Sequence, residues 1–144
     1  YRYVWDNGLS LDSAYPYTAI HENCQRNNPN SSYKLFGYRG LKGGDEDNLL
    51  RALFFIGPIP IAMDANHDEF IFHESGIIDI PTCNPDNLNH AVLAVGYNLT
   101  ETPYLLVKNS YGLNWGTNGY FKIALYRNNM CGISSWATIP YIAF

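Results

Sequence analysis

Two short apolar runs constrain the fold of this chain more than any other feature. The first is LNHAVLAVGY, residues 88–97, and the second is YLLVKNS, residues 104–110. Each run is bounded by turn residues and has the length of a buried strand. Because only a short segment connects them, we expect the two strands to pair as an antiparallel hairpin.

That pairing determines where two polar side chains meet. His90 lies at the start of the first predicted strand and Asn109 at the end of the second. In an antiparallel hairpin the start of one strand lies beside the end of the other, so the two side chains should meet at one edge of an apolar sheet. The contact could be a hydrogen bond that only closes a strand end, or it could hold a reactive imidazole.

The chemistry of the pair gives the reactive interpretation a specific form. An imidazole that acts as a base for a thiol directs one nitrogen toward the sulfur and needs the other one held. The amide oxygen of Asn109 can accept the second N–H without adding negative charge, which suits a thiolate–imidazolium pair. Tyr111 and Trp115 follow closely in the sequence and could exclude water from the bond between His90 and Asn109.

The other segments predict one clear helix and several strands. Residues 1–7 resemble the end of a helix, residues 8–32 an irregular loop, and residues 43–57 a helix capped by Asp45 or Asp47. The apolar face of this helix is expected at Leu49, Leu50, Leu53 and Phe54. Further strands are predicted at 33–41, at 58–65 and at the end of 111–125, and residues 68–80 are predicted to form a short helical turn and then a strand. This pattern indicates an antiparallel barrel or sheet of the α+β class.

Composition and charge argue against several classes of protein. The chain has 144 residues, of which 47% are hydrophobic and 15% charged, which is typical of one globular domain. Its net charge is −4 and it has no basic run, so nucleic acid is not an expected partner. No stretch approaches the length of about 20 apolar residues that spans a bilayer. A polar cluster that could suggest metal binding is interpreted as a solvated surface: His67, Asp68, Glu69, His73 and Glu74.

Several segments together resemble the papain-like cysteine peptidases, and most of all the cathepsin L-like group. The resemblance is carried, in order, by LNHAVLAVGY, PYLLVKNSYGLNWGTNGYFKI and CGISS, with YVWDNG, LDSAYPYTA and FFIGPIPIAMDA upstream. It covers nearly the whole chain and implies the papain-like fold, which is α+β. Residues 1–32 would be the end of the helical left domain and the crossing loop, and residues 33–144 the antiparallel β-barrel right domain that carries the catalytic His and Asn.

The resemblance also implies roles for the hairpin residues. His90 would be the catalytic general base and acid, Asn109 would orient its ring, and Trp115 would shield the pair. The family has Asn-Ser-Trp where this chain has Asn109-Ser110-Tyr111. Tyr111 is still an aromatic shield, but it covers less area and brings a hydroxyl.

A substrate pocket is implied in the same way. The family lines its pocket for the residue two before the scissile bond with positions that match Ala62, Leu88, Ala91 and Trp136. Trp136 falls at the pocket floor, where it would favour small or moderate apolar side chains over arginine. The alternative is that Trp136 packs elsewhere. Asn89 matches a position on the leaving-group side.

The cysteines are odd in number: Cys24, Cys83 and Cys131. The resemblance implies a disulfide between Cys83 and Cys131, and it pairs Cys24 with a cysteine in an N-terminal half that is absent from this sequence. A metal cluster is the alternative, but none of the three shows C-x-x-C spacing. The asparagines of two Asn-x-Ser/Thr sequons, Asn30 and Asn98, are weak indications of a secretory route.

The nucleophile expected from the resemblance is not in the sequence. In the family it lies in a C-G-[SA]-C-[WY] signature, and no such string occurs here. The implied function is therefore a cysteine-type endopeptidase of which this chain is the C-terminal portion, inactive by itself and without metal or organic cofactor. The alternative is an inactive papain-like homologue that acts as a binding protein. Implied partners are polypeptide substrates, the missing N-terminal half, a pro-segment and cystatin-like inhibitors, and the implied location is lysosomal or secreted.

Overall fold

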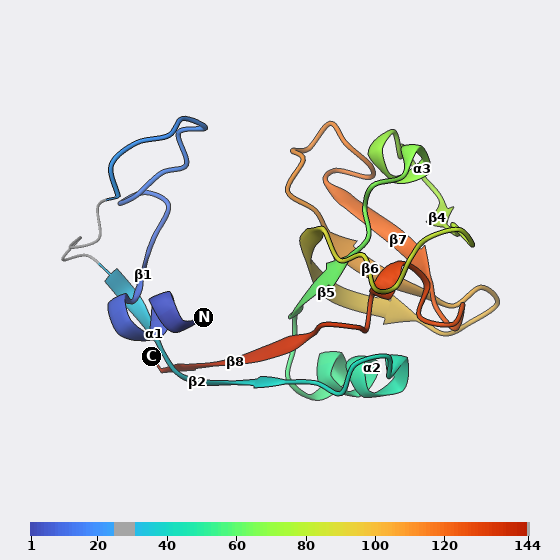
Figure 1. The fold of residues 1–144 in the computed structure, drawn as a ribbon, viewed down its shortest axis with the longest axis horizontal. Helices are drawn as coiled ribbons and strands as arrows, with labels where there is room; N and C mark the ends of the chain where they lie inside the picture. The colour runs from blue at the N-terminus through green and yellow to red at the C-terminus, as the bar shows by residue number, and fades with distance from the viewer. Residues whose placement is uncertain (25–30, 144) are drawn as a thin grey trace. The chain divides into compact units, whose positions relative to one another are not determined.

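The computed structural model describes residues 1–24 and 31–143, and the chain forms two compact units. The smaller unit consists of Tyr1–Arg39 and Pro140–Phe144, and the larger unit of Gly40–Ile139 (Figure 1). The sequon at Asn30 lies outside the described residues. Within the described ranges, no helix has the length and apolarity that crossing a bilayer requires.

The smaller unit contains one helix and a three-stranded sheet of order β1-β2-β8. Its elements are α1 Arg2–Asn7, β1 Leu9–Ser10, β2 Ser31–Gly40 and β8 Thr138–Ala143. The helix predicted at residues 1–7 is thus confirmed, and it ends at Gly8, whose φ of 76° is a left-handed value that favours glycine. The predicted irregular loop contains the short strand β1, which pairs antiparallel with β2.

Aromatic rings pack on the sheet of the smaller unit. Tyr1 stacks on Tyr38 with ring centroids 5.3 Å apart, and Phe36 stacks on Tyr141 at 5.8 Å. A Cβ on Gly37 would lie 3.1 Å from the Tyr141 ring, so a glycine at this position lets the ring approach the strand closely.

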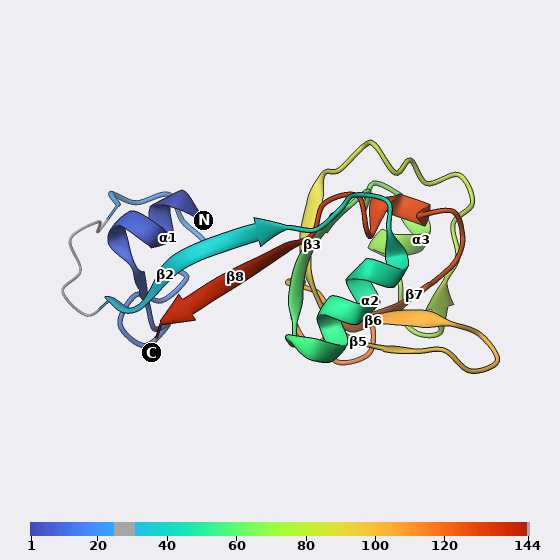
Figure 2. The ribbon, with the colours of Figure 1, turned by 90° about the horizontal axis from the view of Figure 1, so that it is seen from below.

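The larger unit is built around a five-stranded sheet of order β3-β5-β6-β7-β4 (Figures 1 and 2). Its strands are β3 Ile59–Met63, β4 Ile77–Ile78, β5 His90–Asn98, β6 Tyr104–Lys108 and β7 Tyr120–Ala124. The predicted hairpin is confirmed, because β5 and β6 pair antiparallel with Leu93 opposite Lys108 and Asn98 opposite Tyr104. The strand β4 runs parallel to β7, and the other pairs of this sheet are antiparallel. The α+β class predicted from the sequence is confirmed.

The helices of the larger unit are α2 Glu46–Phe55, α3 Asp68–Ile71 and the 3₁₀ helix η1 Met130–Gly132. The predicted cap of α2 is confirmed for Asp45, whose carboxylate accepts the backbone N–H of Asn48 at 2.9 Å. Figure 2 shows α2 lying along the sheet, where it contacts β3 and β5. The helix α2 is the main helix that the sequence predicted, and α3 is the short helical turn predicted at the start of 68–80.

The prediction of the apolar helix face is wrong for one residue. Leu49, Leu50 and Leu53 are buried, but the side chain of Phe54 is 71% exposed. At about 100° per residue, the buried positions of α2 share one arc of the helix, and Phe54 falls outside that arc. Glu46 and Ala52 are the other buried residues of α2, and Phe54 packs edge-on against Phe55 at 4.9 Å.

Alternation along β3 shows how the core is formed. Ile59, Ile61 and Met63 are fully buried, whereas Pro60 and Ala62 between them are only half-buried. The period of two means that the first three side chains point into the core and the other two point away from it. The start of β5, where His90 lies, pairs with the end of this strand, so it is anchored to the best-buried part of the sheet.

Candidate active site

The hairpin brings His90 and Asn109 together. Nε2 of His90 and Oδ1 of Asn109 are 2.8 Å apart, within the distance of a good hydrogen bond. Asn109 is only 9% exposed and follows directly after β6, and its backbone N–H donates to the carbonyl of Gly119. The contact that the sequence predicted between these two side chains is therefore present.

A second hydrogen bond determines which nitrogen of the imidazole carries hydrogen. The backbone N–H of Ser110 donates to Oδ1 of Asn109 at 2.8 Å, which places the amide oxygen, not the NH₂ group, on the side of His90. Because Oδ1 can only accept, Nε2 of His90 must be the donor. In the neutral ring Nδ1 then holds a lone pair, and among the described residues Nδ1 has no hydrogen-bond partner.

Aromatic side chains surround the imidazole. The ring of Tyr111 lies 5.1 Å from the ring of His90, and that of Phe70 lies 5.9 Å away. Trp115 packs behind them, 5.5 Å from Tyr111 and 5.1 Å from Phe70, and its indole N–H donates to the carbonyl of Ile71. Of the two predicted shields, Tyr111 contacts His90 directly and Trp115 supports Tyr111.

Phe70 is the site residue that sequence reasoning missed. It is fully buried, and its ring also contacts Phe121 of β7 at 5.1 Å. The sequence signal was an apolar residue two positions after the acidic start of the predicted helical turn at 68–80. Nothing in that local pattern identifies His90 as its neighbour, because 19 intervening residues separate the two positions in the chain.

A buried carboxylate was missed as well. Asp64 comes directly after β3 and is only 2% exposed. Its oxygens accept five hydrogen bonds from the following groups: the Asn66 backbone N–H at 3.3 Å, His67 Nε2 at 2.9 Å, the Asn84 backbone N–H at 3.1 Å, Asn87 Nδ2 at 3.2 Å and Asn89 Nδ2 at 2.7 Å. This carboxylate therefore ties the loop that leads into β5 to the end of β3.

Asn89 is held from both ends of its amide. Its NH₂ group donates to Asp64, its Oδ1 accepts from the backbone N–H of Ala65 at 2.9 Å, and its own backbone N–H donates to the carbonyl of Met63. Asn89 directly precedes His90, and Met63 lies opposite His90 in the sheet. These bonds fix the register in which the imidazole enters the sheet.

Opposing effects act on the pKa of Asp64. Burial disfavours the charged form and would raise the pKa of this carboxyl. Hydrogen bonds from His67, Asn84, Asn89 and Asn66 favour the charged form and together hold its pKa below the ordinary value. Asp64 therefore remains ionised across the neutral and mildly acidic range.

The interpretation of residues 67–74 as a wholly solvated surface is wrong for its two histidines. Asp68, Glu69 and Glu74 are exposed, as expected. His67 is bonded to Asp64, and His73 packs 5.7 Å from Trp115 with its Nε2 buried and without a partner among the described residues. Desolvation lowers the pKa of His73, because burial disfavours the imidazolium. Spacing along the chain could not indicate that Asp64 is buried beside His67, or that Trp115 lies next to His73.

The residues predicted to line a pocket come from neighbouring segments. Ala62 of β3 lies opposite Ala91 of β5, and the backbone N–H of Ala62 donates to the carbonyl of Trp136 at 3.0 Å. Leu88 lies against Gly132, where its Cδ2 would be 2.7 Å from an added Cβ. Trp136 is 49% exposed, so its ring is not absorbed into the core. Whether these residues bind substrate stays a prediction.

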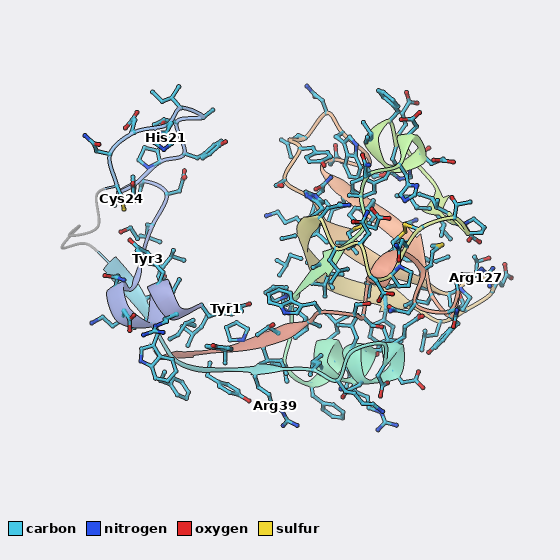
Figure 3. The ribbon with its side chains drawn as sticks, viewed as in Figure 1. Tyr1, Tyr3, His21, Cys24, Arg39 and Arg127 are labelled. Carbon is cyan, nitrogen blue, oxygen red and sulfur yellow. A yellow bond between two sulfur atoms is a disulfide. The ribbon has the colours of Figure 1, made fainter. Side chains whose placement is uncertain are left out.

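The cysteines do not form a metal cluster of thiolates. Cys83 and Cys131 are joined in a disulfide, as the resemblance implied, and Cys24 is exposed in the smaller unit (Figure 3). Donor atoms of Asp64, His67 and Cys83 do lie within 4.8 Å of one another. However, the sulfur of Cys83 is bonded to Cys131 and cannot act as a thiolate ligand.

Comparison with known proteins agrees with this geometry. The sequence model of one family, described as papain family cysteine protease, matches residues 1–141. Human cathepsin L2 is 43% identical to this chain over 148 aligned residues, which cover 99% of the chain and 44% of cathepsin L2. The chain therefore spans less than half the length of this relative.

Solved structures give the same result. Digestive procathepsin L 3 from the larval midgut of Tenebrio molitor superposes with a TM-score of 0.92 at 39% identity, covering 97% of this chain and 46% of that one. A Carica candamarcensis cysteine protease, CMS1MS2, superposes with a TM-score of 0.83 at 29% identity, covering 97% and 65%. The expected papain-like fold is thus confirmed.

Proposed function

Because the chain belongs to the papain family of cysteine proteases, we propose that it is the C-terminal portion of a cysteine endopeptidase in which His90 is the general base and acid. The observation that carries the proposal is the 2.8 Å hydrogen bond from His90 Nε2 to Asn109 Oδ1. It leaves the lone pair of Nδ1 for the reacting groups. The share of cathepsin L2 that the chain covers, 44%, supports the view that the nucleophile lies in another part of the protein.

The reaction then follows from the two nitrogens of His90. A cysteine thiolate, paired with the imidazolium, attacks the scissile carbonyl carbon and forms a tetrahedral oxyanion. When the C–N bond breaks, Nδ1 gives its proton to the leaving amine. Nδ1 next removes a proton from water, which attacks the thioester, and the carboxylic acid product leaves as the thiolate is restored. Nε2–H remains bonded to Asn109 throughout these steps.

Asn109 suits this cycle because it is neutral. An amide oxygen fixes the orientation of the ring without placing a negative charge beside the imidazolium, so the thiolate is left as its ionic partner. Tyr111 covers one side of the imidazole at 5.1 Å, and Trp115 supports Tyr111. We assign both as shields that limit access of water to the bond between His90 and Asn109.

The binding of substrate is proposed for the neighbouring segments. Ala62, Leu88, Ala91 and Trp136 would line the pocket for the residue two before the scissile bond, and Asn89 would face the leaving group. The pairing of Ala62 with Ala91 and the exposed ring of Trp136 support this assignment. Two alanines leave space above the sheet, and the indole would limit the depth of the pocket.

The domain assignment is also a proposal. Residues 1–32 would be the end of the helical left domain with the crossing loop, and residues 33–144 the right domain. The five-stranded sheet within Gly40–Ile139 supports the second assignment. Cys24, which is exposed, would pair with a cysteine of the remaining protein.

Partners and location follow from the same assignment. The partners would be polypeptide substrates, the N-terminal half, a pro-segment and cystatin-like inhibitors. The matched Tenebrio structures are of procathepsins, which supports a pro-segment. The disulfide between Cys83 and Cys131 supports a lysosomal or extracellular location, because disulfides persist in oxidising compartments.

The test uses the full-length protein encoded by the source transcript. We expect a cysteine at the nucleophile position, hydrolysis of a fluorogenic peptide, and covalent labelling by a thiol-directed epoxide. His90→Ala should lower kcat/KM by about a thousandfold or more, within the range reported for the loss of an acid–base group and its nucleophile activation. The matched control is His21→Ala, because His21 lies on the exposed loop of the smaller unit (Figure 3) and should have no effect.

The alternative function, an inactive homologue that binds polypeptides, makes different predictions. It requires a residue other than cysteine at the nucleophile position and predicts neither hydrolysis nor epoxide labelling. Binding of a peptide without turnover, unchanged by His90→Ala, would favour it. Hydrolysis that persists in His90→Ala would contradict the role assigned to this histidine.

A further inference from the structure

The turn between β5 and β6 carries a sequon that the proposed function does not use. β5 ends at Asn98, and the next two residues are Leu99 and Thr100. This is the Asn-x-Ser/Thr pattern of an N-glycosylation acceptor, and the middle residue is not proline. A short sequon occurs often by chance, so the local structure must distinguish an acceptor from a coincidence.

The two polar residues of this sequon are bonded to each other. Oδ1 of Asn98 accepts the backbone N–H of Thr100 at 2.8 Å and the Thr100 hydroxyl at 2.6 Å. The first bond closes an Asx turn, in which an asparagine side chain takes the place of a backbone carbonyl. Both bonds end on the oxygen, so Nδ2 is the part of the amide left to react. Among the described residues, Nδ2 of Asn98 has no hydrogen-bond partner.

The surroundings leave room for a large group. Leu99 is 51% exposed, and Thr100, Glu101 and Thr102 are exposed as well. Asn98 is the last residue of its strand, so a substituent on Nδ2 would neither break a ladder bond nor enter the core. The hairpin tip can therefore carry an oligosaccharide in the folded protein.

We propose that Asn98 is N-glycosylated. The donor is an oligosaccharide linked to a lipid pyrophosphate, and a membrane-bound transferase of the secretory pathway catalyses the transfer. Nδ2 of Asn98 forms a bond with the anomeric carbon, the bond from that carbon to the phosphate oxygen breaks, and the lipid pyrophosphate leaves with the electron pair. Nδ2 loses one proton to a base of the transferase, so atoms and charge balance.

This proposal does not depend on peptidase activity. It requires that the chain enter the compartment in which the disulfide between Cys83 and Cys131 would also form. An inactive homologue on the same route would carry the same glycan. Failure of the glycosylation test and failure of the peptidase test are therefore distinguishable.

The experiment expresses the full-length protein behind a secretory leader in eukaryotic cells. Total cell protein is analysed together with the secreted fraction, because the glycan is added during synthesis and a poorly folded variant still reports it. Asn30→Gln is introduced first to remove the other sequon of residues 1–144. Treatment with peptide N-glycosidase should then remove the glycan at residue 98 and convert Asn98 to Asp, which peptide mass spectrometry locates.

Three further variants test the sequon. In the Asn30→Gln background, Asn98→Gln and Thr100→Val should abolish the glycan at residue 98, since valine has the shape of threonine without its hydroxyl. Thr100→Ser keeps the hydroxyl and should retain glycosylation at lower occupancy. Asn114→Gln, an exposed asparagine outside any sequon, is the matched control and should change nothing. An unmodified Asn98 in the Asn30→Gln protein would overturn the proposal.

Discussion

Asn89 and His90 are adjacent in the chain, but the structure holds them by opposite means. The side chain of Asn89 is fixed by the buried carboxylate of Asp64, which accepts hydrogen bonds from five residues in all. The imidazole of His90 is fixed by a neutral amide and by aromatic rings. The fixed charge of Asp64 therefore contacts Asn89 and not the imidazole to which proton transfer is assigned.

This difference explains how the start of β5 can be held rigidly while the imidazole of His90 has no carboxylate bonded to it. A buried carboxylate that accepts several hydrogen bonds is costly to disturb, so the loop before β5 has one well-defined position. A carboxylate bonded directly to His90 would compete with a thiolate for the imidazolium. In the proposed reaction, Asn109 orients the ring without that competition. We therefore expect variants on the Asp64 side to change stability and variants on the Asn109 side to change activity.

The largest expected effect is the loss of stability in Asp64→Ala. Removing the carboxylate leaves several buried donors without an acceptor, and we expect the free energy of unfolding to fall by about 3 kcal/mol or more. Denaturant unfolding of the full-length protein measures this free energy. Asp68→Ala, an exposed carboxylate four residues away, is the control and should stay within about 0.5 kcal/mol of the wild type. Equal stability of the two variants would refute the role of Asp64 in holding this loop.

The pH dependence of the same residue has a defined sign. The pKa of Asp64 is lowered in the folded state, so its contribution to stability is present above the ordinary value of about 3.9. It is lost as the pH falls through the folded pKa. Acid unfolding curves of the wild type and of Asp64→Asn should therefore converge at low pH, and curves that stay parallel would contradict this.

The next effect is on activity. Asn109→Ala removes the acceptor of the Nε2–H bond, and we expect kcat/KM of the full-length enzyme to fall by about 10- to 100-fold, as for other residues that orient a reacting group. The loss should lie mainly in kcat, because substrate binding is not touched. Asn109→Gln is the conservative variant, and Asn114→Ala is the control. A change in KM alone would argue against an orienting role.

A smaller effect is expected at Tyr111. Its ring is 48% exposed and contacts His90, so Tyr111→Ala should cost about 1 kcal/mol in transition-state stabilisation, or about fivefold in kcat/KM, with little loss of stability. Tyr111→Trp should retain or increase the wild-type rate because it covers more of the ring. Leu113→Ala, another exposed position in the same turn, is the control. If kcat/KM of Tyr111→Ala equals that of Leu113→Ala, the ring of Tyr111 does not act as a shield.

The smallest expected effect is the contribution of His73 to the change of folding stability with pH. Its folded pKa lies below the ordinary value of about 6.5, so the unfolded chain binds a proton at a higher pH than the folded chain does. The contribution of His73 to stability is complete above about pH 6.5 and decreases as the pH falls toward the folded pKa. His73→Phe should flatten the stability profile in that window, whereas His21→Phe should leave it unchanged. An identical slope in wild type and His73→Phe would show that another group titrates there.

The sequence by itself determined the local structure and the family. Strand length, apolar runs and turn residues predicted β3, β5 and β6, and the carboxylate of Asp45 predicted the start of α2, because these signals act within a few residues. The same patterns placed His90 beside Asn109, since an antiparallel hairpin leaves one possible neighbour for each strand end. The papain-like fold was predicted from the motifs and is confirmed by the relatives and the solved structures.

Only the tertiary structure decided what lies around that pair. Asp64 and Asn89 are 25 positions apart, and Phe70 and Tyr111 come from segments with no shared pattern, so no local signal links them. The same limit explains the error at His73, which packs against Trp115 from a distant part of the chain. Local propensities fix backbone geometry over a few residues, whereas burial and ionic contacts depend on groups brought together from distant parts of the chain.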